Sequence, residues 1–257
     1  MTQADWNPES YALFSDLRLR PALDLLARVG ALPEGPVVDL GCGPGAVGPA
    51  LAARFPGRPV VGVDRSPAML EAAQAAGGYT RFVAQDLTEW QPDAPPALIF
   101  SNAALQWLPN HEDLMPRLAA GLAPGGTLAV QMPRQWGAPS HRFLRDIAAS
   151  LFPERFEAQQ PSPVASARRY WELLAGLGEV TAWETDYVQK ISGLGEGHPV
   201  RSFTQSTAMR PYLDRLTPAE AQKFTAAYDA ALEAAYPLLA DGAALMPFRR
   251  VFFTVVV

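Results

Sequence analysis

The stretch VVDLGCGPG, residues 37 to 45, combines an acidic side chain with closely spaced glycines. Asp39 lies near the end of an apolar run, and the turn that follows contains Gly41, Gly43 and Gly45. Because glycine has no Cβ and tolerates positive φ, this spacing predicts a buried strand that leads into a tight turn close to a ligand. A G-x-G-x-x-G turn would bind a pyrophosphate, whereas this spacing, with an acid before it, suits a cationic amine and no phosphate.

Two further acids follow the next predicted strands, at the edge where ligands bind in a doubly wound sheet. Asp64 ends VVGVD, and a carboxylate there can accept hydrogen bonds from both hydroxyls of a ribose. Asp86 in FVAQDL can accept a hydrogen bond from an adenine amino group. Each acid taken alone could be a helix cap or a solvated loop residue. Together with Asp39, they predict a ligand made of an amino acid, a ribose and an adenine, which is S-adenosylmethionine.

Apolar periodicity predicts an α/β fold. Strands are expected at 37–40, 60–63, 81–84, 97–101 and 127–132, and helices at 20–29, 46–55, 67–76 and 111–122. Strands that alternate with helices indicate a parallel sheet covered on both faces. Later in the chain we expect helices at 140–151 and 168–177, an alternating stretch at 180–191, a helical region at 199–236 and a last strand at 250–257.

Composition narrows the function classes. The 257 residues, of which 49% are hydrophobic, suffice for a large core. A net charge of -5 without a dense Lys/Arg run argues against a nucleic-acid partner. Cys42 is the only cysteine and there are three histidines, so we expect neither a disulfide nor a metal site. With a polar start and no apolar run long enough to span a membrane, we expect a cytoplasmic protein that is a monomer or a weak homo-oligomer.

Five motifs between residues 37 and 133 resemble, in order and spacing, those of the Rossmann-like class I methyltransferases that use S-adenosylmethionine. They are VVDLGCGPG, GVDRSPAML, FVAQDL, IFSNAALQWL and LAPGGTLAVQMP. More narrowly, the chain resembles the trans-aconitate 2-methyltransferase family over nearly its whole length. DWNPESYALF, RPALDLLARV, SNAALQWLPNH, MRPYL and YPLLADG carry this resemblance. It implies a mostly parallel seven-stranded sheet with helices on both faces and a helical cap.

The resemblance implies transfer of a methyl group from S-adenosylmethionine to one carboxylate oxygen of a small polycarboxylic acid such as trans-aconitate. The products would be a monomethyl ester and S-adenosylhomocysteine. Because a carboxylate is already ionised at pH 7, no general base is needed, and we expect catalysis by positioning without a dedicated catalytic residue. Two alternatives stay open. One is a methyltransferase of the same fold with another acceptor, such as a different carboxylic acid, an acyl-carrier thioester, or a ring carbon or nitrogen. The other is a dinucleotide-dependent oxidoreductase or a non-catalytic nucleotide-binding module.

The predicted cofactor-binding residues include the three acids and the glycine turn. The full set is Trp6, Tyr11, Arg20, Asp39, Gly41, Cys42, Gly43, Gly45, Asp64, Arg65, Met69, Asp86, Leu87, Asn102, Ala103 and Trp107. Trp6 and Tyr11 would form a lid over the cofactor, although a flexible tail is the alternative.

A polycarboxylate needs donors, and arginine grips carboxylates with two parallel hydrogen bonds. Arg210 and Arg250 are the best candidates and Arg20 is a third, although each could be a solvated surface residue. The predicted substrate-binding residues are Gln106, Trp107, Trp136, His141, Tyr170, Arg210, Tyr212 and Arg250. For the aromatic residues, core packing is the alternative role.

We expect a single domain over residues 1–257. Within it, residues 1–30 would form the N-terminal lid and first helix, and residues 31–133 the cofactor-binding half. Residues 134–249 would form the substrate side, with a helical cap inserted before the last strand.

Overall fold

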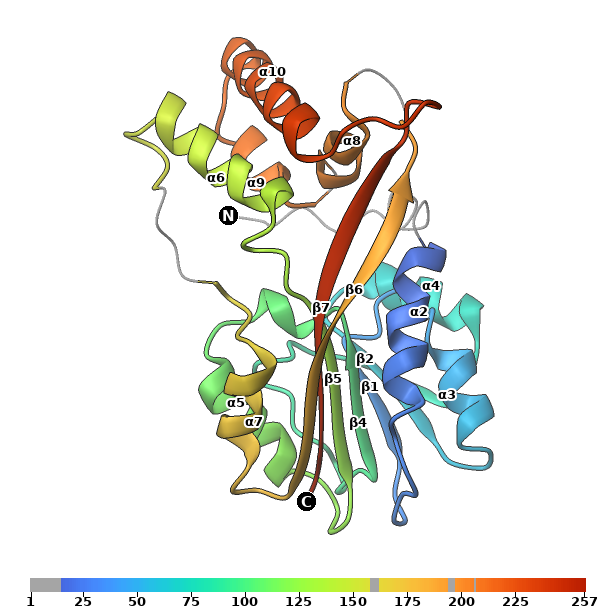
Figure 1. Ribbon diagram of the computed structural model, residues 1–257. Coiled ribbons are helices and arrows are strands. Elements are labelled where there is room, and N and C mark those ends of the chain that lie inside the picture. The colour runs from blue at the N-terminus through green and yellow to red at the C-terminus, as the bar shows by residue number, and fades with distance from the viewer. Residues whose placement is uncertain (1–14, 158–161, 194–196, 206) are drawn as a thin grey trace. The chain divides into compact units, whose positions relative to one another are not determined.

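The computed structural model describes residues 15–157, 162–193, 197–205 and 207–257, with side chains described from residue 19 onward (Figure 1). The predicted lid residues Trp6 and Tyr11 therefore lie outside the described residues. The strands are β1 (Val37–Leu40), β2 (Val60–Asp64), β3 (Arg81–Ala84), β4 (Leu98–Asn102), β5 (Thr127–Pro133), β6 (Glu179–Ile191) and β7 (Ala244–Val256). The helices are α2 (Ser15–Leu26), α3 (Gly48–Arg54), α4 (Pro67–Ala76), η1 (Leu105–Trp107), α5 (His111–Ala120), α6 (Pro139–Leu151), α7 (Ala167–Leu174), α8 (Pro199–Gln205), α9 (Arg210–Leu213) and α10 (Pro218–Ala235).

The seven strands form one sheet in the order β3-β2-β1-β4-β5-β7-β6. The pairings of β1 with β2 and β4, of β2 with β3, and of β4 with β5 are parallel. Asp39 on β1 lies level with Gly62 on β2 and Phe100 on β4. The carboxyl ends of these strands therefore meet at one edge of the sheet, and the predicted α/β fold is confirmed.

The chain divides into two compact units. The first contains residues 1–133, 165–184 and 251–257, and the second contains residues 134–164 and 185–250. The strands β6 and β7 contribute residues to both units. The expected single domain and its internal boundaries stay predictions.

In the first unit, helices lie on both sides of the strands. Figure 1 shows α2, α3 and α4 on one side and α5 and α7 on the other. All four residues of β1 are buried, which is typical of a parallel strand covered on both faces. The helix α4 begins as the sequence predicts, because the Ser66 hydroxyl accepts a hydrogen bond from the Met69 N–H at 3.4 Å and Pro67 follows the cap.

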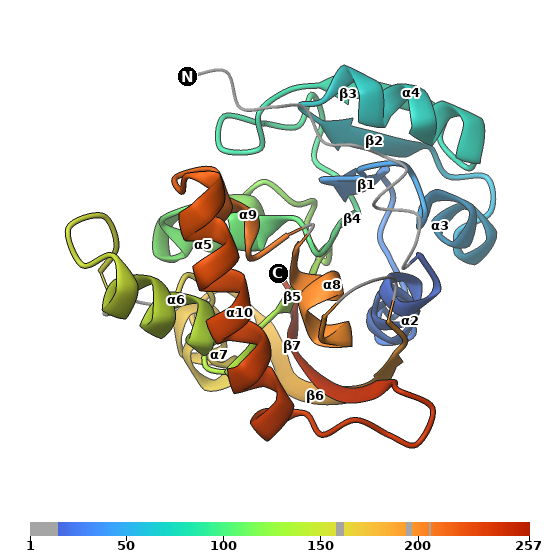
Figure 2. The ribbon, with the colours of Figure 1, turned by 90° about the horizontal axis from the view of Figure 1, so that it is seen from above.

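In the second unit, α10 packs along α6 (Figure 2). Phe224, Tyr228 and Leu232 recur every four residues on α10 and are fully buried. A capping box begins this helix, in which the Thr217 hydroxyl and the Glu220 carboxylate each accept a hydrogen bond from the other residue's backbone N–H.

The largest differences from the predicted elements occur in three places. The first described helix begins at Ser15 rather than at residue 20, so Pro21 lies inside it. The helical region predicted at 199–236 is three helices, because Pro211 and Pro218 begin new helices where their missing N–H groups cost no hydrogen bond. The last strand begins at Ala244 rather than at residue 250. Its buried and exposed residues alternate from Ala244 to Arg249, and residues 250–255 are all buried.

The stacked pair Tyr170 and Phe253 generates a stability prediction for the first unit. Both side chains are almost completely buried, and their ring centroids lie 4.7 Å apart. We expect Phe253→Ala to lower the free energy of unfolding by about 3–5 kcal/mol, because the cavity cannot fully collapse. Chemical denaturation measures this change, and Phe253→Leu, which keeps most of the volume, should lose less. An alanine variant within about 1 kcal/mol of the wild type would contradict this packing.

Candidate functional site

The glycine turn after β1 is shaped by close packing on two of its glycines and by open space at the third. Gly41, Gly43 and Gly45 have φ values of 82°, 52° and 85°, all in the left-handed region. A Cβ on Gly41 would collide with the Ala104 methyl group, and one on Gly45 would lie 2.7 Å from the Cα of Ala73. A Cβ on Gly43 would meet nothing within 4 Å. The turn therefore has an open side at Gly43, as a ligand that approaches the backbone requires.

Asp64 holds this turn to the beginning of α4. One carboxylate oxygen accepts a hydrogen bond from the Gly43 N–H at 3.0 Å, and the other accepts one from the Ser66 N–H at 2.9 Å. A carboxylate offers about four lone-pair positions, so two remain for further donors. The prediction that Asp64 accepts the ribose hydroxyls is compatible with this geometry.

Asp39 is a buried carboxyl group with a raised pKa. Only 2% of the residue is exposed, and its Oδ2 accepts a hydrogen bond from the Tyr79 hydroxyl at 2.7 Å. Burial raises the pKa of Asp39 to about 7, the hydrogen bond from Tyr79 opposes this rise, and the negative charge of Asp64 adds to it. A nearby cation would favour the ionised form. Tyr79 is not among the residues predicted from the sequence, since it lies 40 positions from Asp39 in the chain.

The end of β4 adds two buried acceptors beside the turn. Asn102 Oδ1 and Gln106 Oε1 are buried and have no hydrogen-bond partner among the described residues. Between them, Ala103 has a positive φ of 53°, and its carbonyl accepts a hydrogen bond from the Gln106 amide at 2.7 Å. Orphaned acceptors and a strained backbone mark functional sites. Since the adjacent Ala104 contacts Gly41, these acceptors belong to the same region and suit a ligand with N–H donors.

The end of β3 approaches the same turn. The Leu87 side chain would lie 3.2 Å from a Cβ on Gly41. Asp86 accepts hydrogen bonds from the Thr88 N–H and hydroxyl at 2.9 and 2.7 Å, and these bonds hold the pKa of its carboxyl below the usual range. Its second oxygen lies 3.9 Å from Arg65. The contact of Asp86 with adenine stays a prediction.

The remaining cofactor predictions fall into buried and exposed residues. Cys42 and Met69 are buried, and burial raises the pKa of the Cys42 thiol, which therefore stays protonated. Trp107 is 59% exposed, the largest exposure of an aromatic side chain among those described. Arg20 is exposed and lies 4.0 Å from Asp24 on α2. The roles of all four in cofactor binding stay predictions.

The second unit contains a buried guanidinium that sequence analysis missed. Arg145 on α6 is 7% exposed, and its guanidinium lies 4.0 Å from the centroid of the Trp136 ring. It donates to the carbonyls of Trp136 and His141 at 2.8 and 3.3 Å. Its Nε is buried without a hydrogen-bond partner, and no carboxylate of the described residues pairs with it. A buried cation of this kind favours an anionic ligand.

Two predicted substrate-binding residues lie near Arg145. Burial lowers the pKa of His141 to about 4, and the positive charge of Arg145 lowers it further, so this imidazole is neutral at pH 7. Burial raises the pKa of Tyr212, while Arg145 opposes that rise. The spacing of His141 and Arg145, four residues apart on one helix, was the available signal for a shared face. The structure thus brings together Trp136, His141 and Tyr212 around Arg145.

The other substrate predictions have different surroundings. Arg250 is 3% exposed, and its guanidinium lies 4.6 Å from the Phe248 ring centroid, whereas Arg210 is exposed at the beginning of α9. Tyr170 belongs to the core of the first unit, where its hydroxyl lies 2.6 Å from His111 Nδ1. These contacts account for Tyr170 without a substrate, so we do not retain it in the proposed site.

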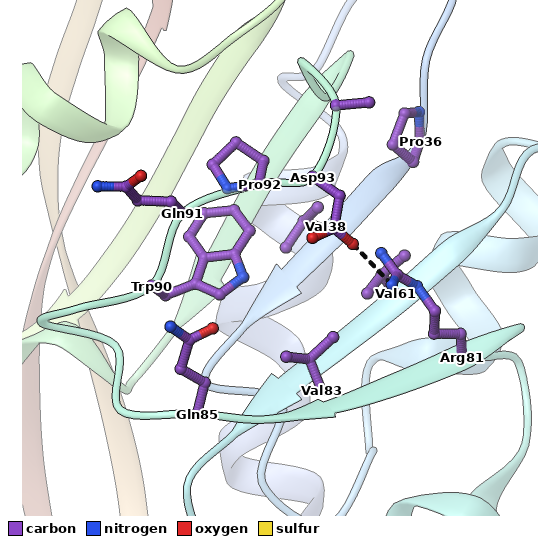
Figure 3. A pocket seen from close by; sticks show the side chains of 11 residues that line it. Pro36, Val38, Val61, Arg81, Val83, Gln85, Trp90, Gln91, Pro92 and Asp93 are labelled. Carbon is purple, nitrogen blue, oxygen red and sulfur yellow. Dashed lines mark hydrogen bonds and ion pairs between the residues drawn. The ribbon is translucent and has the colours of Figure 1, made fainter.

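A small hollow elsewhere on the first unit does not fit a nucleoside. Val38, Val61 and Val83 line it together with Trp90, and an ion pair between Arg81 and Asp93 lies at its edge (Figure 3). Its volume is about 90 Å³. Ligand pockets usually measure roughly 300–1,000 Å³, so the glycine turn remains the candidate cofactor site.

Within the described parts of the chain, no group of three or more His, Cys, Asp and Glu residues could hold a metal ion. The helices described there are too short or too polar to cross a membrane.

Comparisons with solved structures agree with the fold. The YcgJ protein of Bacillus subtilis is 15% identical, with a TM-score of 0.58 over 92% of this chain and 98% of that chain. Phosphoethanolamine N-methyltransferase 2 of Haemonchus contortus, solved with S-adenosyl-L-methionine, is 16% identical with a TM-score of 0.50. The alignment covers 92% of this chain and about half, 52%, of that longer enzyme.

Sequence comparisons identify the family. A methyltransferase domain model matches residues 37–126. Trans-aconitate 2-methyltransferase of Methylobacterium nodulans is 46% identical, and that of Methylobacterium radiotolerans is 43% identical, each over 97% of both chains. The enzyme of the same name from an Azoarcus species is 41% identical over 98% of both chains. The chain therefore belongs to the trans-aconitate 2-methyltransferase family of S-adenosylmethionine-dependent methyltransferases.

Proposed function

We propose that this chain transfers a methyl group from S-adenosylmethionine to a carboxylate oxygen of a small polycarboxylic acid such as trans-aconitate. The family supplies the reaction class, since its named relatives align over nearly the whole chain. The observation that carries the acceptor class is the buried Arg145 guanidinium, which has no carboxylate partner among the described residues.

The residues at the carboxyl ends of the strands fit the cofactor. Asp64 has lone pairs left for the two ribose hydroxyls, and Gly43 leaves space beside the turn. Asp39 and the orphaned oxygen of Asn102 would accept hydrogen bonds from the methionine amine. Asp86 would accept one from the adenine amino group. These assignments match the charge and donor pattern of S-adenosylmethionine.

When bound, S-adenosylmethionine supplies an electrophilic methyl group on a sulfonium ion. The acceptor carboxylate is ionised at pH 7, so this chain has no proton to remove. Its contribution is to orient the carboxylate oxygen and to restrict water, and orientation can supply roughly 7–11 kcal/mol. The neutral His141 fits this role, because an uncharged imidazole can donate one hydrogen bond to the acceptor carboxylate. It is not needed as a base, since the carboxylate is already ionised.

Arg145 suits a carboxylate that is bound but not methylated. Its Nη1 is committed to two backbone carbonyls, while its Nε has no partner in the described structure. Stacking on Trp136 fixes the guanidinium plane. An acid with several carboxylates can present one to this fork while another reacts, which a monocarboxylic acid cannot do.

A methyl-transfer assay against a panel of acids tests the proposed function directly. The purified chain would be incubated with isotopically labelled S-adenosylmethionine and with trans-aconitate, a saturated tricarboxylate, a dicarboxylate or a monocarboxylate. We expect a labelled monomethyl ester from the polycarboxylates, with trans-aconitate among the best acceptors. Transfer to a thioester or a ring nitrogen, with none to any polycarboxylate, would contradict the proposal and favour another acceptor on the same fold.

We expect Asp64→Ala to weaken S-adenosylhomocysteine binding by about 2–4 kcal/mol, because a charged acceptor for two hydroxyls is lost. Isothermal titration calorimetry measures this affinity. Asp93→Ala, at the surface ion pair with Arg81, is the control and should bind as the wild type does. An unchanged dissociation constant for Asp64→Ala would contradict the prediction that Asp64 binds the ribose hydroxyls.

We expect Arg145→Gln to lower kcat/KM for a tricarboxylate, because a substrate carboxylate loses its charged partner. The loss should correspond to about 2–5 kcal/mol of activation free energy. S-adenosylhomocysteine affinity should change little. Arg145→Lys should restore only part of the loss, since an ammonium cannot reproduce two parallel hydrogen bonds. Arg142→Gln, an exposed arginine on the same helix, is the matched control.

Steady-state kinetics with a tricarboxylate and its monocarboxylate analogue would decide the role of Arg145. Equal losses with both acceptors would show that Arg145 does not bind the second carboxylate. The same comparison with Arg250→Ala and Arg210→Ala tests the two arginines predicted from sequence, and the burial of Arg250 makes it the stronger of the two.

A further inference from the structure

We propose that Tyr79 is a positioning residue for the cofactor, because its hydroxyl donates a hydrogen bond to the buried Asp39 carboxylate and so favours the ionised form that would pair with the methionine amine. This inference rests on the proposed role of Asp39. It concerns a residue outside all the predicted site residues, on the segment between α4 and β3.

The Tyr79 ring is held in place independently of its hydroxyl. The ring covers Gly48, where any Cβ would collide with it, so this glycine admits the ring at the beginning of α3. The ring also lies close to Phe82 of β3, with 5.0 Å between the ring centroids. The hydroxyl then reaches Asp39 Oδ2 at 2.7 Å. Because packing fixes the ring, Tyr79→Phe removes the hydrogen bond with little change in shape.

The groups around Asp39 make this hydrogen bond important. Its ionised form is opposed by burial and by the charge of Asp64, and only Tyr79 among the groups that shift its pKa favours it. Burial and the Asp39 charge raise the pKa of Tyr79, so its hydroxyl keeps its proton and remains a donor. Cys42, in the adjoining turn, also stays protonated and adds no charge. The bond to Tyr79 therefore limits the rise of the Asp39 pKa, which reaches about 7.

The direction of the pH effect follows from these charges. The Asp39 pKa of about 7 is above its ordinary value, so the carboxyl becomes protonated as the pH falls through 7. A cationic amine binds the ionised form better, and cofactor affinity should therefore decline below that pKa. Without the Tyr79 hydroxyl the pKa rises further, and the decline moves to higher pH. Each unit of that rise weakens binding about tenfold at pH values below both pKa values.

The experiment is calorimetric titration of S-adenosylhomocysteine into the wild type, Tyr79→Phe, Asp39→Asn and the double variant, from about pH 5.5 to about pH 8.5, a range set around the Asp39 pKa. We expect Tyr79→Phe to bind more weakly than the wild type near pH 6.5, by about tenfold if its Asp39 pKa is one unit higher, and to approach the wild type at the alkaline end. Asp39→Asn should bind weakly with little dependence on pH. The double variant should match Asp39→Asn, since Tyr79 acts through that carboxylate.

A second readout uses the ligand-free protein. The Asp39 carboxyl carbon, followed by NMR in isotopically labelled protein, should titrate at higher pH in Tyr79→Phe than in the wild type. Tyr228→Phe is the control, because it also removes a buried tyrosine hydroxyl, one that donates to the Ser140 carbonyl at 2.6 Å in the second unit. It should leave both the Asp39 titration and the pH dependence of binding unchanged.

The outcomes separate this inference from the proposed site. If Tyr79→Phe weakens binding equally at every pH, or leaves the Asp39 titration unmoved, Tyr79 has only a packing role and the inference is overturned. If Asp39→Asn binds like the wild type at every pH, the assignment of Asp39 to the amine fails, and the inference fails with it. A loss for Asp39→Asn together with wild-type behaviour of Tyr79→Phe overturns the inference alone.

Discussion

The two backbone hydrogen bonds accepted by Asp64 are the constraint on which the cofactor region depends. They connect the Gly43 turn after β1 to Ser66 at the beginning of α4, so three elements meet at one carboxylate. The turn can come this close only because Gly41 and Gly45 have no side chains. The same carboxylate keeps lone pairs for a ligand. In the proposed cofactor site, the carboxylate that fixes the loop geometry would therefore also bind the ribose.

Each of the two units contains a buried ionisable side chain that forms no ion pair among the described residues. In the first, Asp39 is a buried acid near the midpoint of its titration at neutral pH. In the second unit, Arg145 is a buried cation with no carboxylate partner among the described residues. Each state is costly in the free protein and favours a ligand of opposite charge. Such a design suits methyl transfer to a carboxylate, which needs orientation and charge matching rather than proton removal.

The features that could be predicted from the sequence are those that depend on residues close together in the chain. The glycine turn, the acids at the strand ends and the Ser66 cap all depend on neighbours in the chain, and the order of apolar runs predicted the parallel strands. Tyr79 was missed because its partner Asp39 lies 40 residues away, and no local pattern reports such a contact. Arg145 was missed because burial of a charged residue inside a helix depends on tertiary packing. For the same reason the sequence could not decide between a substrate-binding role and the alternatives found here, an exposed position for Arg210 and a core position for Tyr170.

A crystal structure of the protein with S-adenosylhomocysteine bound would test the proposed cofactor site, because it shows which atoms the ligand contacts. We expect both ribose hydroxyls to contact the Asp64 carboxylate and the backbone of Gly43 to contact the ligand. The methionine amine should lie within hydrogen-bond distance of Asp39 or Asn102. A nucleoside bound away from the glycine turn, or an amine that contacts neither residue, would contradict it.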